Sequence, residues 1–413
     1  MSSFRYAPAV LLGRGVRLAA RLRTAGGGSA LPGLVVNRVA PGFLGSVLSS
    51  FPEGLVVVSG SSGKSTTTKM LVEILTAHGK RIFTNPSTAN ISQGLTSALL
   101  ERASLTGRID ADLAVLEMDE GHGALLSDRF RARLVLLTNV MTDQIDRFHD
   151  GQKVQAMLGR IAARAFGAVV INGDDAMLAR LEPTASVVRF GVTDEVLAAS
   201  PRGLGYAETT RARIGDGVVV TSVAGREAEI VVAGKPLAVR LPAKGVHYAV
   251  DAAGALAAAA ELLGAEFDPA VATAALAAMS PVFGRGEVST VRGQEVEFVL
   301  VQNPASFQLN VDELDPDLDQ IMVAMGSDVR DPSYFWPVDA TRIGRARVVA
   351  GSKADEIALQ LLYQGVRVDE IEPDLAAALD RFLALPAPEH GIKTIVFTAD
   401  SMRRTRSHVG LTS

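Results

Sequence analysis

The sequence predicts an α/β protein with a central ATPase domain, built on a parallel sheet of the phosphate-loop type and carrying a β-hairpin insertion. A C-terminal Rossmann-like α/β domain is expected to follow. Two observations support this prediction. A continuous apolar run at residues 55–58 leads directly into the glycine-rich segment 60–66 and then into a helix, which is the arrangement that binds phosphate groups. Further apolar runs alternate with helix-length segments, as right-handed β-α-β crossovers require.

The chain is expected to contain three parts. An N-terminal helical segment, 1–54, should pack on an ATP-binding domain at 55–280, and 281–413 should form the C-terminal domain. Apolar runs of strand length are found in both domains. They lie at 55–58, 113–116, 134–137 and 168–171 in the first, and at 298–301, 320–325, 347–350 and 394–397 in the second.

Between these series the pattern changes. Short alternating segments between 198 and 239 are separated by glycine-containing turns and predict β-hairpins. Alanine-rich segments at 248–263 and 269–279 then predict closely packed helices.

Composition excludes several classes of function. The chain has 413 residues, a net charge of −4 and no dense basic block, so no nucleic-acid partner is expected. It has no cysteine, which excludes disulfides, thiolate metal sites and a cysteine nucleophile within the chain. The N-terminal residues predict an amphipathic helix, and no apolar run reaches the roughly 18 to 20 residues of a membrane span. A cytoplasmic protein that is not transmembrane is therefore expected, with the inner face of the membrane as one location.

The glycine-rich segment is the strongest functional motif. Backbone N–H groups next to its glycines can approach phosphate oxygens, and the start of a helix adds a favourable dipole. Lys64 would reach the β- and γ-phosphates of ATP, and the Ser65 hydroxyl would bind Mg²⁺. Two residues separate the glycines, where the commonest phosphate loop has four. The predicted loop comprises Gly60, Ser61, Ser62, Gly63, Lys64, Ser65 and Thr66.

Polar residues follow three later strands. Glu117 is the expected second Mg²⁺ ligand, because it ends the strand 113–116 and offers a hard oxygen donor. Asp119 and Glu120 follow it and are equally well explained as helix-capping or solvated side chains. Further along the chain, Asn139, Asn172 and Asp174 are expected at the nucleotide, although turn formation accounts for the segment 172–175 almost as well.

Taken together, these motifs resemble the Mur ligase family, and most closely its MurT-type members, the synthetase subunits of lipid II isoglutaminyl synthase. The loop is similar to the family's GTNGKTT type. Other similar segments span nearly the whole chain: 26–33, 84–87 with Asn90, 143–148, 303–307, 333–336, 371–375 and 398–406.

The resemblance implies a reaction and a partner. ATP would phosphorylate the α-carboxylate of D-glutamate in a lipid-linked peptidoglycan precursor, and ammonia would displace the phosphate to give D-isoglutamine. Ammonia would come from a separate glutaminase subunit of the GatD type, bound by the C-terminal domain in a heterodimer. Arg285, in an element similar to the family's GRxE, would close onto the phosphates as a catalytic residue. The substrate would be contacted by Thr84, Asn85, Ser87 and Asn90.

The chain also departs from this family. It has no four-cysteine zinc ribbon, and the family's HNxxN element is replaced by a segment that ends at Asp251. Pro337 stands where MurT-type chains have an aspartate that would complete the glutaminase triad, and Asp328, Asp331 or Asp339 could substitute. Two alternatives therefore stay open: a Mur-ligase-like amide synthetase acting on another carboxylic acid, and an ATP-binding scaffold without catalysis.

Overall fold

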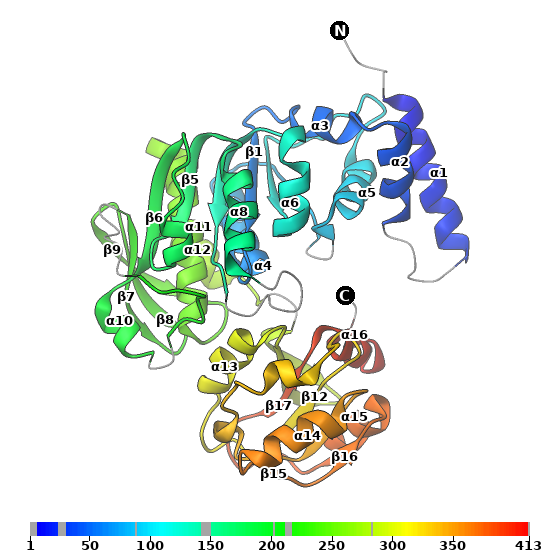
Figure 1. Cartoon of the computed structure of the whole chain (residues 1–413), viewed down its shortest axis with the longest axis vertical. Helices are drawn as coiled ribbons and strands as arrows, with labels where there is room; N and C mark the ends of the chain where they lie inside the picture. The colour runs from blue at the N-terminus through cyan, green and yellow to red at the C-terminus, as the bar shows by residue number, and fades with distance from the viewer. Residues whose placement is uncertain are drawn as a thin grey trace. The chain divides into compact units, whose positions relative to one another are not determined.

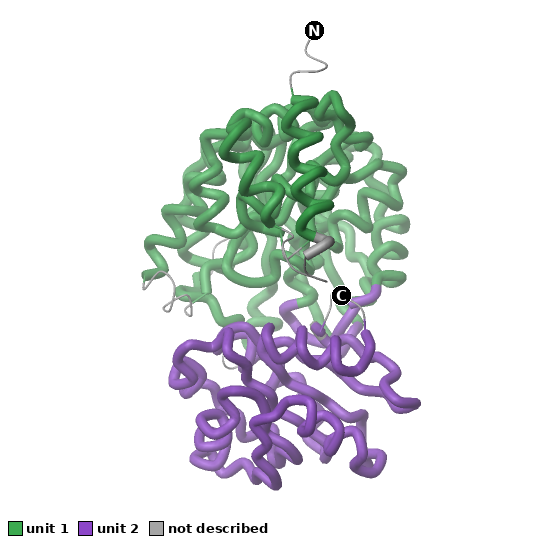
Figure 2. Tube along the Cα trace, turned by 90° about the vertical axis from the view of Figure 1, so that its right-hand side faces the viewer, with its two compact units in different colours: residues 1–223, 227–241, 248–279 green, residues 224–226, 242–247, 280–413 purple. Residues whose placement is uncertain are grey.

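The computed structural model describes residues 6–23, 30–86, 89–141, 150–200, 203–210, 217–281 and 284–411. The chain divides into two compact units (Figure 2). Unit 1 comprises residues 1–223, 227–241 and 248–279, and unit 2 comprises 224–226, 242–247 and 280–413.

Unit 1 is built on a nine-stranded sheet with the order β2-β3-β1-β4-β5-β6-β7-β8-β9 (Figure 1). The neighbouring pairs from β2 to β7 are parallel, whereas β8 and β9 form an antiparallel hairpin. The predicted hairpin strands thus continue the central sheet. The strands are β1 Leu55–Ser59, β2 Ile82–Thr84, β3 Leu113–Glu117, β4 Ala132–Leu137, β5 Ala165–Asn172, β6 Ser186–Val192, β7 Val218–Ala224, β8 Glu227–Val232 and β9 Lys235–Arg240.

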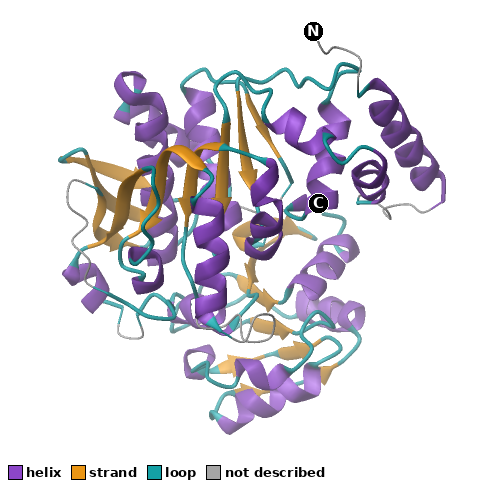
Figure 3. Ribbon diagram, turned by 45° about the horizontal axis from the view of Figure 1, so that its top comes forward, coloured by secondary structure: helices purple, strands orange, loops and turns teal. Residues whose placement is uncertain are grey.

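Helices cover the central sheet on both faces (Figure 3). Every residue of β1 and β3 is therefore buried. Helix α6 packs against α8, and α4 packs against α12. The helices of this unit are α1 Ala7–Arg23, α2 Leu31–Val39, α3 Phe43–Leu48, α4 Lys64–Ala77, α5 Ser92–Arg102, α6 Glu120–Leu126, α8 Gly151–Ala162, α9 Ala176–Ala179, α10 Asp194–Ala198, α11 Val246–Leu263 and α12 Pro269–Ala278.

Helix α11 explains the alanine-rich segment. Alanine side chains let it pack closely in the interior, and Gly254 lies against the ring of Phe190 on β6. The helix and its short extension, Val246–Glu266, are long and apolar enough to cross a membrane, but 78% of the apolar window is buried inside the protein. It is therefore read as a core helix.

Unit 2 has a separate six-stranded sheet with the order β10-β11-β17-β12-β14-β16. It is parallel except for the antiparallel pair β10–β11, which confirms the predicted Rossmann-like α/β class. Its strands are β10 Arg285–Val291, β11 Gln294–Leu300, β12 Ile321–Ala324, β14 Val348–Ala350, β16 Ile371–Glu372 and β17 Lys393–Phe397. Strands β13 Arg345–Ala346 and β15 Arg367–Val368 form a separate two-stranded sheet. Its helices are α13 Pro304–Asp312, α14 Ala354–Tyr363, α15 Leu375–Ala384 and α16 Ala399–His408.

Candidate functional site

The glycine-rich loop joins β1 to α4 in unit 1, as predicted. Both of its glycines have backbone torsions that disfavour side chains, with φ of 136° at Gly60 and 79° at Gly63. A Cβ atom on Gly60 would lie 2.2 Å from Thr138 Oγ1, and one on Gly63 would lie 2.3 Å from Asp251 Oδ1. Only glycine fits at either position, so the loop is closely enclosed by neighbouring strand ends and α11.

This enclosure gives the first prediction. Gly60→Ala is expected to lower the free energy of unfolding by about 2 to 4 kcal/mol, because it adds both a steric clash and backbone strain. The matched control is Gly79→Ala, where φ is +82° but, apart from its chain neighbours, no atom of the described residues lies within 4 Å of the added Cβ. Denaturant unfolding of both variants separates the two effects. Equal losses in the two variants would show that the clash at Gly60 contributes nothing.

The segment after β4 holds the loop in shape. The Asn139 carbonyl accepts a 2.9 Å hydrogen bond from Ser61 N, and its Oδ1 accepts one of 2.9 Å from Ser62 N. Asn139 Nδ2 and Thr138 Oγ1 donate to the Ser62 carbonyl at 3.2 and 2.6 Å. Both side-chain amide atoms of Asn139 are thus engaged with the loop, and a direct contact with nucleotide stays a prediction.

Lys64 is the first residue of α4, and its side chain turns back over the loop. Its Nζ donates to the carbonyls of Gly60 at 2.5 Å and Ser61 at 3.1 Å. It also lies 3.4 Å from Glu120 Oε2, on a side chain that is fully buried. Among the described residues, Glu120 Oε1 has no hydrogen-bond partner. The ammonium group is therefore held at the glycine-rich loop by Glu120, a carboxylate for which sequence patterns predicted no definite role.

Glu117 lies one strand away from the loop. In the parallel register its Cα partner is Val58 on β1, so the carboxyl ends of the two strands meet at one edge of the sheet. The carboxylate is buried, and its Oε1 accepts a 3.3 Å hydrogen bond from Asn90 Nδ2. Asn85 brackets the Glu117 backbone, accepting from its N–H at 3.0 Å and donating to its carbonyl at 3.0 Å.

These contacts show where the predicted substrate residues lie. Asn85 and Asn90 support Glu117, whereas Thr84 is an exposed residue at the end of β2. Ser87 and the segment 143–148 lie outside the described residues. A contact between substrate and any of these residues stays a prediction.

The donor set next to the loop suits a magnesium ion bound together with nucleotide. Ser65 and Glu117 offer hard oxygen donors, which Mg²⁺ prefers, and Mg²⁺ takes most of its remaining ligands from phosphates and water. Within the described part of the chain, no three His, Cys, Asp or Glu side chains form a group that could hold a metal. Asp119 instead caps α6, accepting from Gly121 N and His122 N at 3.1 Å each.

The acidic pair after β5 is engaged within the fold. Asp174 accepts a 2.8 Å bond from Val192 N, and Asp175 accepts one of 2.5 Å from Val140 N while capping α9. Asn172 Nδ2 donates to the Tyr206 hydroxyl at 2.8 Å. Burial raises the pKa of both aspartates from 3.8 to about 6. This cluster holds strand ends together, and nucleotide contacts by Asn172 or Asp174 stay predictions.

The raised pKa values predict how stability depends on pH. Folded Asp174 keeps its proton to higher pH than the unfolded chain does, so its contribution is fully present below pH 3.8 and is lost as the pH rises to about 6. Asp174→Asn retains the acceptor for Val192 N and cannot ionise. Relative to wild type, it should therefore gain about 2 to 3 kcal/mol of stability between pH 4 and pH 7. Guanidinium unfolding at both pH values measures this, with the exposed Glu182→Gln as control. A wild-type-like pH profile in Asp174→Asn would contradict it.

The carboxylates predicted to support a partner lie in unit 2. Asp328 follows β12 and accepts a 2.9 Å bond from Thr398 Oγ1, at the end of β17. Asp331 and Asp339 each accept from residues two positions later, Ser333 and Thr341, and stabilise short 3-10 turns. The Ser333 hydrogen bonds hold the pKa of Asp331 below its usual value. The side chain of Arg285 lies outside the described residues.

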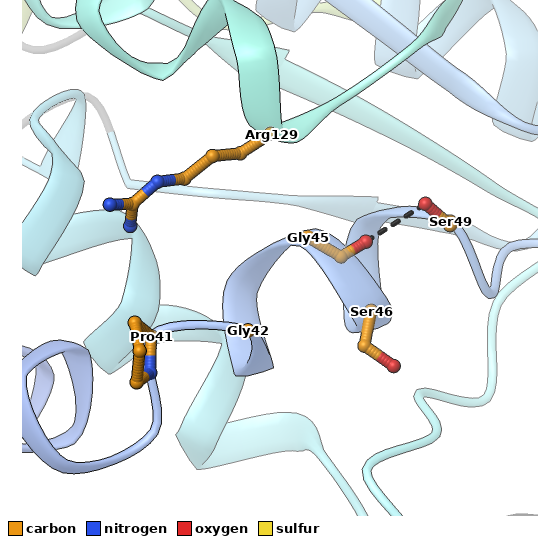
Figure 4. A pocket seen from close by; sticks show the side chains of 6 residues that line it. All are labelled: Pro41, Gly42, Gly45, Ser46, Ser49 and Arg129. Carbon is orange, nitrogen blue, oxygen red and sulfur yellow. Dashed lines mark hydrogen bonds between the residues drawn. The ribbon is translucent and has the colours of Figure 1, made fainter.

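A hollow of about 590 Å³ lies elsewhere in unit 1 (Figure 4). None of the predicted site residues lines it, so the candidate site rests on the contacts of the phosphate loop. Its lining comprises Pro41, Gly42, Gly45, Ser46, Ser49 and Arg129.

Comparison with known proteins shows which families and folds this chain resembles. Residues 58–259 match the Mur ligase middle domain. The chain is 27% identical over 387 residues to the MurT subunit of lipid II isoglutaminyl synthase (glutamine-hydrolyzing) from Streptococcus pneumoniae, covering 84% of each chain. It has the fold of MurF from Acinetobacter baumannii (TM-score 0.69, 16% identity, 92% of this chain and 80% of that chain). It also has the fold of folylpolyglutamate synthase from Mycobacterium tuberculosis, solved with ADP (TM-score 0.65, 18% identity, 98% and 99%).

The glycine-rich loop with Lys64 and the similarity to MurT and to other Mur-type ligases support an ATP-dependent ligase. Residues 58–259 are thus similar to the Mur ligase middle domain, and the chain is similar to MurT over most of its length.

Proposed function

We propose that this chain is the ATP-dependent amidating subunit of a two-subunit enzyme, acting on the D-glutamate α-carboxylate of lipid II. The observation that carries the proposal is the similarity to MurT, which extends over 84% of both chains. A match confined to the ATP-binding region would support only a general ligase. The proposed location is the cytoplasm, at the inner face of the membrane.

The chemistry follows from the poor reactivity of a carboxylate. Transfer of the γ-phosphoryl group to a carboxylate oxygen releases ADP and gives an acyl phosphate. Ammonia then attacks the carbonyl carbon, inorganic phosphate leaves, and the nitrogen loses a proton to give the amide. Bound Mg²⁺, held by Ser65 and Glu117, would offset negative charge on the phosphates. Lys64 would do the same from the start of α4, where the backbone N–H groups also favour anions.

A partner subunit would supply ammonia. The chain has no cysteine, so a cysteine-dependent glutaminase must be a different polypeptide. Unit 2 offers a surface for it, because Trp336 and Tyr363 have 54% and 82% of their area exposed. Two glutamines connect α14 to the segment 335–338: Gln360 Nε2 donates to the Phe335 carbonyl at 2.6 Å, and Gln364 Nε2 donates to the Val338 carbonyl at 2.7 Å. Exposed aromatic residues are enriched in the energetic centres of protein interfaces.

A second substrate class remains a candidate because of two residues. Asp251 packs against the loop glycine Gly63 where the family motif has asparagine, and Pro337 replaces an aspartate. These changes favour an amide synthetase that acts on another carboxylic acid and uses free ammonia or an amine.

The test is co-expression with the glutaminase encoded nearest to this chain, followed by measurement of ADP release. Release that requires both lipid II and glutamine would support the amidating subunit. Release with ammonium chloride and another acid, but not with lipid II, would move the assignment to the second candidate. Absence of ADP release with every acid, from protein that binds ATP, would contradict both.

A further inference from the structure

The N-terminal region of unit 1 has an unusual charge. The first 52 residues contain six arginines, whereas none of the 45 Asp and Glu residues of the chain lies there. The chain as a whole has a net charge of −4. Because acidic residues are absent there, this end of the sequence has a net positive charge, carried by Arg5, Arg14, Arg17, Arg21, Arg23 and Arg38.

Helix α1 has two apolar faces. One is directed into the protein, where Val10 is fully buried and a Cβ on Gly13 would lie 2.8 Å from Leu100 on α5. The other is directed to solvent: Leu11 and Leu18, two turns apart, have 57% and 64% of their area exposed. Only the inner face is explained by the packing of unit 1.

Helix α2 continues this exposed apolar surface. It lies beside α1 and packs on α5 (Figure 1), with Gly33 hydrogen-bonded to Ser97 at 2.8 Å. Its outer residues Leu31, Leu34 and Val39 have 44%, 56% and 58% of their area exposed. The two helices thus hold six of the fifteen large hydrophobic side chains that are exposed in the described residues, which is a concentration and not the usual scatter.

Polar contacts fix α1 with these leucines outward. Arg14 Nη2 donates to the Ala103 carbonyl at 2.6 Å, and Arg17 forms a 2.7 Å ion pair with Glu101 at the end of α5. Glu101 offsets the charge of one arginine, so the region keeps a positive excess. The helix cannot turn its leucines inward without losing both contacts.

We propose that the outer face of α1 and α2 docks on an anionic lipid membrane. Exposed leucines on a helix that contains arginines and no acidic residues match a surface that is apolar inside and negatively charged outside. Each arginine near such a surface contributes about 1 kcal/mol. This inference rests on the proposed function, because a lipid-linked substrate would lie in the same membrane on which the helices dock. A second copy of the chain fits less well, because two faces of the same positive charge would repel.

Vesicle flotation of the full chain tests the proposal. Wild type should float with vesicles of phosphatidylglycerol and phosphatidylcholine, should not float with phosphatidylcholine alone, and should be released by added salt. Leu11→Gln/Leu18→Gln should bind the anionic vesicles at least about tenfold more weakly. The matched control is Leu359→Gln/Leu362→Gln, two exposed leucines of α14, which should bind as wild type does.

Three results would overturn the proposal: equal binding to both vesicle types, unchanged binding of Leu11→Gln/Leu18→Gln, or equal loss in the control. Light scattering provides a further check, since a change of oligomeric state without a change in vesicle binding would assign the surface to self-association. If the variant does not fold, the release of wild type from anionic vesicles by added salt still tests the proposal. Failure of the proposed function is distinguishable, because vesicle binding needs no turnover.

Discussion

Lys64→Ala is expected to lower the rate of ATP-dependent amide formation by about 10³-fold, because one positioned cation at the transferred phosphoryl group is removed. The side chain lies at the start of α4, where it contacts two loop carbonyls and Glu120. On ATP binding it would exchange carbonyl contacts for phosphate oxygens. The measurement is ADP release at saturating ATP.

The control for this variant is Lys153→Ala. Lys153 is an exposed lysine of α8, and its replacement should leave the rate within about twofold of wild type, as surface substitutions usually do. If Lys64→Ala turned over ATP at the wild-type rate, the loop would not be the catalytic phosphate site.

Glu117→Gln is expected to lower the rate by about 10²-fold at ordinary Mg²⁺ concentration and to raise the Mg²⁺ concentration needed for half-maximal activity. The amide keeps the shape of the side chain and an acceptor for Asn90, but it removes the negative charge that favours the metal. The measurement is a Mg²⁺ titration of ADP release, with the exposed Glu73→Gln of α4 as control.

A second carboxylate sharpens this experiment. Glu120 contacts Lys64, so Glu120→Gln should lower the rate while leaving the Mg²⁺ requirement unchanged. If Glu120→Gln shifted the Mg²⁺ titration and Glu117→Gln did not, the two roles would have to be exchanged.

Local patterns predicted the fold class and the loop because both depend on short sequence segments. The run at 55–58 ends in a glycine-rich segment, and the structure has β1, the loop and α4 in that order. Strand β2 has three residues and β16 has two, too short to produce a recognisable pattern. Strand β6 escaped prediction because its residues are partly exposed and include Arg189.

The supporting contacts of the site could not be predicted from the sequence. Asn139 contacts Ser62 of the loop across 77 positions of sequence, and Asn85 contacts Glu117 across 32. Only the order of strands in the sheet brings these residues together. Glu120 had a possible signal, since it follows the strand-ending Glu117 by three residues. Helix capping explained Asp119 and Glu120 equally well until the structure assigned capping to Asp119.

Isotope transfer tests whether this chain activates a carboxylate by phosphorylation. Lipid II carrying ¹⁸O in the D-glutamate α-carboxylate would be incubated with the chain, ATP and ammonium chloride, and the released phosphate analysed by mass spectrometry. Each phosphate formed with amide should carry one ¹⁸O atom, because an acyl phosphate passes its bridging oxygen to phosphate. Amide formation with unlabelled phosphate would contradict it.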